Sequence, residues 1–332
     1  MIYPFSKVMV TGGCGFIGSH FIEQLSILHP QVSILNLDSC TYAVSKNTIE
    51  MLNTLKNYSL IRADIRNANA VNSAIESFKP EIIIHFAAES HVDNSIKDPN
   101  IFLESNILGT ANMLNAINNL QLQDHVLFHH ISTDEVFGDM KLDSANKFEE
   151  NSPINPSSPY AASKASSDML VKAWSRTYGI RYIITNCGNN YGPRQNSEKL
   201  IPTVIKCLLE NKKIPVYGSG KNIRDWIYVT DHAKILIELH KSKAINDEFN
   251  IGLSNELSNL ELIKQIYDYL SKSIDLNDFN ETVNFIEDRK GHDLRYALNS
   301  KKLMKIIEYK NNRTFSECIG ETINWYISNM KW

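Results

Sequence analysis

A glycine-rich turn near the amino terminus constrains the fold more than any other stretch of the chain. The apolar segment 7–11 stops at Gly12, and apolar residues return at helical spacing in the segment 19–28. Gly15 and Gly18 complete a G-x-x-G-x-x-G pattern between these segments. Glycines so placed allow a tight turn after a strand and let the backbone approach a pyrophosphate group. The pattern indicates a dinucleotide-binding unit, although a plain tight turn is an alternative.

An acidic residue follows the second expected strand. The apolar segment 32–37 ends at Asp38, which lies twenty residues beyond Gly18. In dinucleotide-binding folds a carboxylate at this place holds the ribose of adenosine. Strand, glycine turn, helix, strand and acid together favour an NAD site over a plain turn. Asp64 follows the next apolar run and is a candidate contact for the adenine, but an acid there is also a common helix cap.

The same alternation continues through most of the chain. Strands separated by helical patterns form a parallel sheet covered on both faces. We therefore expect an α/β fold, a doubly wound parallel Rossmann-type sheet with a smaller C-terminal α/β substrate lobe. The further expected strands are 58–62, 81–86, 125–132 and 181–187, and the further expected helices are 68–78, 100–120 and 160–178.

The composition narrows the function classes. The 332 residues are 43% hydrophobic and 21% charged with a net charge of −3, which is typical of a globular protein and argues against nucleic acid as a partner. No apolar run reaches the roughly 18 residues of a membrane helix. The first residues lack a basic segment followed by a long apolar one, so a cytoplasmic protein is expected. The five cysteines are widely spaced, which favours free thiols and no metal site.

A hydroxyl residue and two acidic residues follow the expected strand 125–132. Thr133, Asp134 and Glu135 follow one another at what should be the carboxyl end of that strand, where parallel α/β sheets bind ligands. Two adjacent carboxylates repel each other unless the site uses them. Neighbours along an extended strand point to opposite faces, so the chain must bend here if both acids are to reach one ligand. Gly138 would permit that bend.

Tyr160 and Lys164 lie one helical turn apart at the start of the expected helix 160–178. A lysine ammonium close to the phenol, with a nicotinamide cation nearby, would lower the tyrosine pKa and make it a usable base near neutral pH. In most proteins this spacing marks an exposed tyrosine–lysine pair on a helix with no functional role. The preceding dinucleotide half-fold and the hydroxyl of Thr133 favour the catalytic interpretation.

These motifs together resemble the extended short-chain dehydrogenase/reductases that act on nucleotide sugars. Within that superfamily, the triplet from Thr133 to Glu135 resembles that of the dTDP-glucose 4,6-dehydratases, and the resemblance spans nearly the whole chain. Related epimerases keep the hydroxyl residue, the tyrosine and the lysine but lack the adjacent acids. Phe137, Gly188 and the segment 194–197 depart from the family pattern. The last departure lies near the expected substrate lobe and leaves the choice between dTDP and UDP open.

The resemblance implies a division of the chain and a set of contacts. Residues 1–188, with 226–250 returning to them, would form the NAD-binding Rossmann domain, and 189–225 with 251–332 the nucleotide-sugar-binding lobe. Candidates for cofactor contact are Gly12, Gly15, Phe16, Ile17, Gly18, Asp38, Asp64, Ile65, Ala87, Ala88, Tyr160, Lys164 and Asn190. Candidates for substrate contact are Ser90, Asn189, Lys199, Leu200, Pro215, Tyr217, Arg224, Asn259, Arg289, His292 and Tyr296.

The implied activity is the conversion of a nucleoside-diphosphate glucose to its 4-keto-6-deoxy sugar and water. Tyr160, with Lys164 and Thr133, would take the proton of the 4-hydroxyl while hydride passes to NAD+. Glu135 would then remove the C5 proton, and Asp134 would protonate the leaving 6-hydroxyl before hydride returns to C6. Relatives pair the helices 100–120 and 160–178 in a homodimer, although these apolar stripes could also face only the sheet.

Two alternative functions share the same fold. A nucleotide-sugar epimerase or decarboxylase would use the same NAD and the same Tyr160, but it has no use for Asp134 and Glu135. A non-enzymatic NAD-sensing regulator would need neither the acids nor the tyrosine and lysine.

Overall fold

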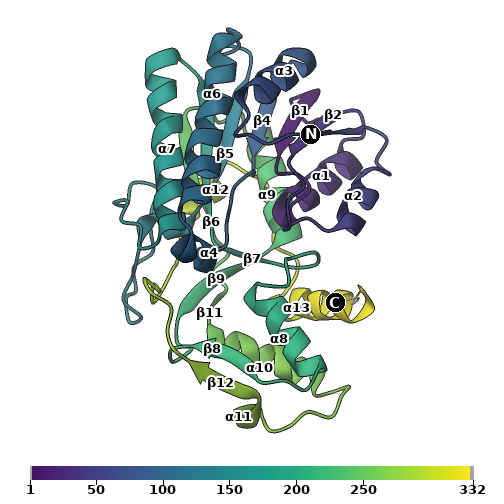
Figure 1. Ribbon diagram of the computed structural model, residues 1–332, viewed down its shortest axis with the longest axis vertical. Helices are drawn as coiled ribbons and strands as arrows, with labels where there is room; N and C mark the ends of the chain where they lie inside the picture. Colours follow the sequence, from purple (N-terminus) through teal and green to yellow (C-terminus); the bar gives the residue numbers. More distant parts are fainter. Residues whose placement is uncertain (1, 330–332) are drawn as a thin grey trace.

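Seven parallel strands form the main sheet of the computed structural model, which describes residues 2–329 (Figure 1). The strand order is β10-β6-β5-β4-β1-β2-β3, and every neighbouring pair is parallel. The order reverses between β1 and β4, where doubly wound sheets open a crevice for ligands. The strands are β1 (Lys7–Thr11), β2 (Ser33–Asp38), β3 (Tyr58–Arg62), β4 (Ile82–His85), β5 (Leu127–Thr133), β6 (Arg181–Cys187) and β10 (Asp247–Ile251).

Alternating side chains of the strands fill two separate cores. Val8 and Val10 of β1 pack toward one group of helices, and Met9 between them packs toward the other, as the period of two along a strand requires. Both faces are thus buried, which confirms the doubly wound fold expected from the sequence. The first face carries α1 (Phe16–Leu28), α2 (Lys46–Leu52), α9 (Val229–Lys241) and α12 (Lys301–Met304), and the second carries α3 (Ala68–Phe78), α6 (Gly109–Asn119) and α7 (Pro159–Tyr178).

The expected elements agree with the observed ones to within a few residues, with one difference in kind. The helix expected over 100–120 consists of α5 (Asn100–Phe102), a π-helical segment η1 (Leu103–Leu108) and α6. Buried Asn106 lies in the π-helical segment, where its carbonyl accepts hydrogen bonds of 2.6 Å from the hydroxyls of Thr110 and Ser167. Hydrophobic periodicity does not distinguish this wider turn from an α-helix, and π-bulges commonly occur at functional sites.

A smaller lobe occupies the lower part of Figure 1. Its three-stranded sheet has the order β11-β9-β7, and a separate parallel pair joins β12 to β8. Helices of the lobe cover these strands around a core that includes Tyr191, Trp226 and Ile266. The elements are β7 (Asn189–Tyr191), β8 (Ile214–Tyr217), β9 (Ile223–Tyr228), β11 (Glu256–Ser258), β12 (Val283–Ile286), α8 (Leu200–Leu209), α10 (Asn259–Leu270), α11 (Phe279–Thr282) and α13 (Phe315–Asn329).

The chain crosses between the two parts more than once. After β9 it passes through α9 to β10, which pairs with β6 at the edge of the main sheet. A short helix, α4 (Val92–Lys97), follows β4 and contacts α7. Among residues 2–329 no helix is both long enough and apolar enough to span a membrane.

Candidate active site

A cavity of about 420 Å³ lies at the carboxyl ends of the main-sheet strands. All thirteen candidates for cofactor contact line it, and so do Thr133, Asp134 and Glu135. Of the candidates for substrate contact, Ser90, Asn189 and Lys199 line it. The fold therefore brings together residues that lie up to 187 positions apart in the sequence, from Gly12 to Lys199.

The glycine turn forms one wall of the cavity. Gly12 has a φ of +68°, and a Cβ there would lie 2.6 Å from the backbone nitrogen of Ala87. A Cβ on Gly18 would lie 2.5 Å from the carbonyl oxygen of Gly12. Side chains at either position would push the turn away from β4 or from the start of α1. The bare backbone at the amino terminus of α1 fits an anionic pyrophosphate, as expected for a dinucleotide.

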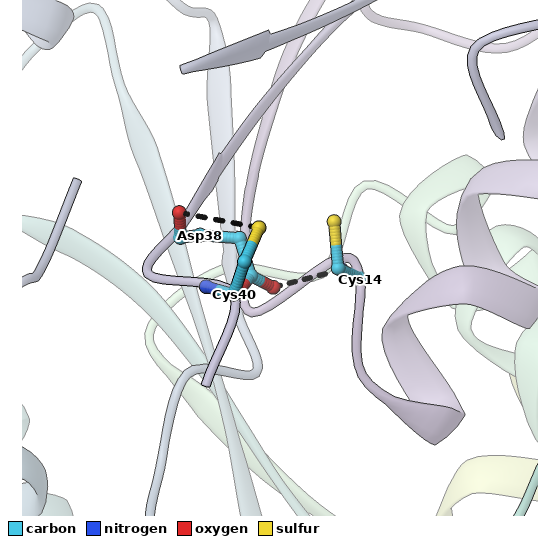
Figure 2. A group of neighbouring side chains, drawn as sticks. All are labelled: Cys14, Asp38 and Cys40. Carbon is cyan, nitrogen blue, oxygen red and sulfur yellow. Dashed lines mark hydrogen bonds between the residues drawn. The ribbon is translucent and has the colours of Figure 1, made fainter. Parts of the chain in front are cut away.

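Asp38 ends β2 and lines the same cavity. Figure 2 shows Asp38 with Cys14 and Cys40. Its carboxylate accepts hydrogen bonds from the backbone nitrogens of Cys14 and Cys40, at 2.8 and 2.7 Å. The ligand atoms of these three residues also lie within 4.8 Å of one another, a spacing that suits a metal ion. Burial, however, raises the pKa of the Cys14 thiol to about 12 and also raises that of Cys40. We therefore interpret the group as an anchor that orients the Asp38 carboxylate.

Asp64 is held by a neighbour on its own loop. Its carboxylate accepts hydrogen bonds from the guanidinium and the backbone nitrogen of Arg66, and the bond from the guanidinium is the main cause that lowers the pKa of Asp64. The helix-cap alternative does not apply, because Asn67 caps α3 by accepting a hydrogen bond from the backbone nitrogen of Ala70.

The chain bends where the two acids begin. Thr133 ends β5 and caps a single 3₁₀ turn, η2 (Asp134–Phe137), by accepting a hydrogen bond of 3.3 Å from the backbone nitrogen of Glu135. Gly138 ends the turn at a φ of +82°. A Cβ there would clash with the carbonyl oxygen of Asn155, so the position requires glycine. The turn directs both acids into the cavity, as the sequence argument requires.

The surroundings of the two acids differ. Burial and the charge of Glu135 raise the pKa of Asp134 well above its usual range. Burial also raises the pKa of Glu135, but the cations Arg224, Lys199 and Arg289 oppose the rise. Asp134 is therefore the better proton holder of the pair, and Glu135 the better base. This is the pattern by which two neighbouring carboxyl groups take separate acid and base roles.

Tyr160 and Lys164 lie in the first turns of α7 and line the cavity. The Ser158 hydroxyl caps this helix by accepting a hydrogen bond from the backbone nitrogen of Ala161. The Lys164 ammonium donates a hydrogen bond of 2.8 Å to the carbonyl oxygen of Ile131. We expected a lowered pKa for Tyr160 once a nicotinamide cation lies beside it, whereas the side chains of the protein by themselves raise this pKa. Burial is the main cause, with Glu135 adding to it, and the hydrogen bond with Thr133 opposes it.

The remaining substrate candidates lie outside the cavity lining. Arg289 forms an ion pair of 2.7 Å with Asp93, and its guanidinium lies 5.1 Å from the ring centre of Tyr217. Arg224 stacks over Tyr296 at 4.4 Å. His292 pairs with Asp288. Leu200 and Asn259 begin α8 and α10, and Pro215 lies exposed in β8.

The sequence reasoning missed several polar residues around the site. Asn36 accepts a hydrogen bond from the backbone nitrogen of Gly13 and so stabilises the glycine turn. Asn106 holds the backbone of Glu89 through both the oxygen and the nitrogen of its side-chain amide. Asp168 lies buried one turn beyond Lys164. Only Asp168 had a signal in the sequence, namely its spacing of four residues from the lysine on a helix.

Comparison with known proteins agrees with this geometry. A family model described as GDP-mannose 4,6 dehydratase matches residues 9–322. The dTDP-glucose 4,6-dehydratase 1 of Escherichia coli strain K12 is 42% identical over 340 residues, covering 98% of this chain and 94% of the relative. The structure of the dTDP-glucose 4,6-dehydratase DesIV from Streptomyces venezuelae, with NAD bound, has a TM-score of 0.89 at 37% identity and covers 97% of each chain.

Epimerases share the architecture at lower identity. The structure of UDP-glucose 4-epimerase from Thermus thermophilus, in complex with NAD, has a TM-score of 0.86 at 26% identity, covering 98% of this chain and 100% of its own. The dehydratase relative is more similar in sequence over nearly the same span. The chain therefore belongs to the dTDP-glucose 4,6-dehydratase family, within the extended short-chain dehydrogenase/reductase superfamily.

Proposed function

We propose that this protein is an NAD+-dependent dTDP-glucose 4,6-dehydratase. The observation that carries the proposal is the turn that places Thr133, Asp134 and Glu135 in one cavity with Tyr160 and Lys164. The relatives in E. coli and S. venezuelae bear the name of this activity. Their identity over nearly the full chain supports dTDP as the nucleotide, which the sequence alone left open.

The chain is shaped to hold NAD along the glycine turn. Gly12 and Gly18 leave the backbone bare for the pyrophosphate, and Asp38 is oriented to accept hydrogen bonds from the adenosine ribose. Bound NAD+ supplies the hydride acceptor for a sugar carbon and returns the hydride later in the cycle. The nicotinamide ring would lie against Tyr160 and Lys164, because these residues line the same cavity and are the proposed groups for the redox step.

The first chemical step is oxidation at C4 of the glucose. Tyr160 accepts the proton of the 4-hydroxyl, helped by its hydrogen bond with Thr133. Lys164 contributes a positive charge nearby, which favours the phenolate once the cavity also holds a nicotinamide cation. The resulting 4-ketone makes the C5 hydrogen acidic.

The second step removes water across C5 and C6. Glu135 takes the C5 proton, and Asp134 gives its proton to the 6-hydroxyl as the C6–O bond breaks. The raised pKa of Asp134 keeps that proton available near neutral pH. Three cations face Glu135 and hold its pKa below that of a carboxyl buried alone. The 4-keto-6-deoxy product forms after C6 is reduced and C5 is reprotonated.

Incubation of the purified protein with dTDP-glucose, UDP-glucose, GDP-mannose and UDP-glucuronic acid tests the proposal. We expect dTDP-glucose to yield a product lighter by one water, identified by mass spectrometry. An epimerised sugar of unchanged mass would support the epimerase alternative, and loss of carbon dioxide from a nucleotide-linked uronic acid would support the decarboxylase. A protein that binds NAD but leaves every sugar unchanged would support the regulator and refute the dehydratase.

The assembly and location follow as part of the same proposal. The segment η1 and helix α7 expose Leu103, Leu108 and Met169, and a homodimer would cover them. All five cysteines are free, which fits the reducing conditions of the cytoplasm.

A further inference from the structure

Asp168 is a buried carboxylate that the proposed reaction does not use. It lies on α7 four residues beyond Lys164 and eight beyond Tyr160, so the three side chains share one face of the helix. Ser132 of β5 donates a hydrogen bond of 2.9 Å to Oδ2 of Asp168. Oδ1 has no hydrogen-bond partner among the described residues, and it lies 3.3 Å from Nε2 of His130.

The same nitrogen of His130 also contacts Lys164. The Lys164 ammonium lies 3.4 Å from Nε2 of His130, and its hydrogen bond to Ile131 directs it toward β5. Burial lowers the pKa of His130 well below its usual range, so this imidazole is neutral at neutral pH. A neutral ring thus stands between a buried ammonium and a buried carboxylate. A buried ammonium without a counter-charge is unstable and loses its proton.

The other ionisable groups near Lys164 cannot supply that counter-charge. His130 and His85 of the sheet are buried and neutral at neutral pH. Burial raises the pKa of Cys187 on β6 to about 12, so it stays a thiol. Tyr160 on the same helix face is protonated in its resting form. Glu135 faces Arg224, Lys199 and Arg289 instead, and Asp168 is the carboxylate whose charge raises the pKa of Lys164. Lys172 favours the ionised form of Asp168.

We propose that Asp168 is a positioning residue for the redox step: its charge keeps Lys164 protonated and in place, while Ser132 orients the Asp168 carboxylate. The inference rests on the proposed function for its kinetic consequence but not for its electrostatic one. In support, burial lowers the pKa of Lys164 to about 8 while Asp168 opposes that change. Burial raises the pKa of Asp168 to about 6. Both groups are therefore charged between about pH 6 and pH 8.

A titration of Tyr160 gives a test that needs no substrate. The variant Asp168→Asn keeps the shape and the acceptor for Ser132 but removes the charge. Phenolate absorbance, measured as the difference between each holoenzyme and its Tyr160→Phe counterpart, reports the pKa of Tyr160. In the holoenzyme the nicotinamide cation would bring the Tyr160 pKa into the range where Lys164 is still protonated, and there we expect Asp168→Asn to raise that pKa by about one unit or more. Loss of a nearby anion acting directly on Tyr160 would lower it, so the direction of the shift identifies an effect through Lys164.

The pH dependence of turnover gives the second test. In Asp168→Asn, Lys164 loses its proton at lower pH, so the alkaline limb of kcat should move down by about one unit, with kcat at pH 8 reduced about fivefold. KM for dTDP-glucose should change less than about threefold, because Asp168 is not a proposed substrate contact and its loss should leave ground-state binding unchanged. Ser132→Ala, which removes one hydrogen bond to Asp168, should shift the limb in the same direction by less.

Asp231→Asn is the matched control. Asp231 is another buried aspartate, on α9, and burial raises its pKa as well. Its substitution should move neither the alkaline limb nor the Tyr160 pKa. Unchanged titration and pH limbs in both Asp168→Asn and Ser132→Ala would overturn the inference. If the unaltered protein dehydrates no nucleotide sugar, the proposed function fails, and the Tyr160 titration still decides the role of Asp168.

Discussion

Asp134 and Glu135 carry the same functional group, and their surroundings give them separate tasks. Asp134 is buried against Thr133 and Glu135. Glu135 faces the cations of the smaller lobe, Arg224 and Arg289, together with Lys199. A proton shared by the pair therefore resides mainly on Asp134. The acid and the base of the proposed dehydration are assigned by this difference in environment.

Substitution of Glu135 by glutamine should stop the reaction between its two steps. The C5 proton would have no base, so loss of water should fall by about 10²- to 10⁴-fold. Retention of NAD and oxidation at C4 should persist, because neither depends on the Glu135 carboxylate. Mass spectrometry of the product and incorporation of deuterium at C5 in heavy water measure the two steps separately. Water loss at the original rate in Glu135→Gln would show that another residue is the base.

Asp134→Asn is the matched variant for the acid. It should also lose activity on dTDP-glucose, by a similar factor of about 10²- to 10⁴-fold. A substrate whose 6-hydroxyl is replaced by fluoride has a leaving group that needs no proton. We expect this substrate to restore elimination in Asp134→Asn but not in Glu135→Gln. Equal rescue of both variants would contradict the division of roles.

At the scale of elements, the 3₁₀ turn η2 follows strand β5 and carries the proposed acid and base, Asp134 and Glu135. It depends on Gly138, whose positive φ and contact with Asn155 leave no space for a side chain. Gly138→Ala should lower the free energy of unfolding by about 2–4 kcal/mol, from a strained backbone and a steric clash. Because the turn also sets the positions of Asp134 and Glu135, kcat should fall more than NAD affinity. Urea unfolding and steady-state kinetics measure the two effects.

Gly179→Ala provides the comparison for that prediction. Gly179 ends α7 with nearly the same φ, +79°, but a Cβ there would meet no atom within 4 Å. The cost should be only that of the left-handed backbone, about 1 kcal/mol. A loss of stability as large as that of Gly138→Ala would mean that the contact with Asn155 contributes little.

At the scale of the whole molecule, a chain of buried hydrogen bonds joins the amino-terminal segment to helix α9 and to strands β5 and β6 of the main sheet. Tyr3 contacts Nδ1 of His240, and Nε2 of His240 contacts His129, each at 2.7 Å. Thr185 continues the chain at 3.1 Å from His129. Burial lowers the pKa of His240 to about 3. These histidines stabilise the fold in their neutral forms, so acid should destabilise it.

The sign of this pH effect follows from the folded and unfolded pKa values of His240. The unfolded chain binds a proton at this residue below about pH 6.5, whereas the folded chain does not until about pH 3. Between these values each drop of one pH unit costs about 1.4 kcal/mol of stability from this group. His240→Gln should therefore reduce the slope of stability against pH by about that amount below pH 6.5. Urea unfolding at several pH values measures it, and an unchanged slope would contradict the prediction.

The proposed homodimer belongs to the same scale. α6 and α7 lie side by side at one edge of the molecule (Figure 1). Leu108 of η1 is 58% exposed, and Met169 of α7 is 43% exposed. Leu108→Glu combined with Met169→Glu should convert the protein to monomers, because charges would be buried in the interface. Ile27→Glu, on α1 and 63% exposed, should not. Analytical ultracentrifugation distinguishes the states, and a dimer that survives the double change would place the interface elsewhere.

Local patterns were sufficient to predict most of the fold. The apolar strands, the glycine turn and the helical periodicity are short-range features, and the sheet confirmed them within a few residues. The bend at Asp134 was predictable because two neighbours on a strand cannot face one ligand without it. The π-helical segment around Asn106 was not predictable, since its hydrogen-bond partners Ser163 and Ser167 lie on α7, more than fifty residues further along the chain.

The sequence by itself determined the kind of chemistry, because residue types and spacings of three to twenty positions carry it. Tertiary structure decided the protonation states. Burial raises the pKa of Tyr160 in the protein itself, so the expected lowering depends on Lys164 together with a nicotinamide cation. The depth of a group and the charges that surround it depend on elements far apart in the chain, such as β5, α7 and the smaller lobe. The role inferred for Asp168 arises only there, where Ser132 and His130 meet the helix.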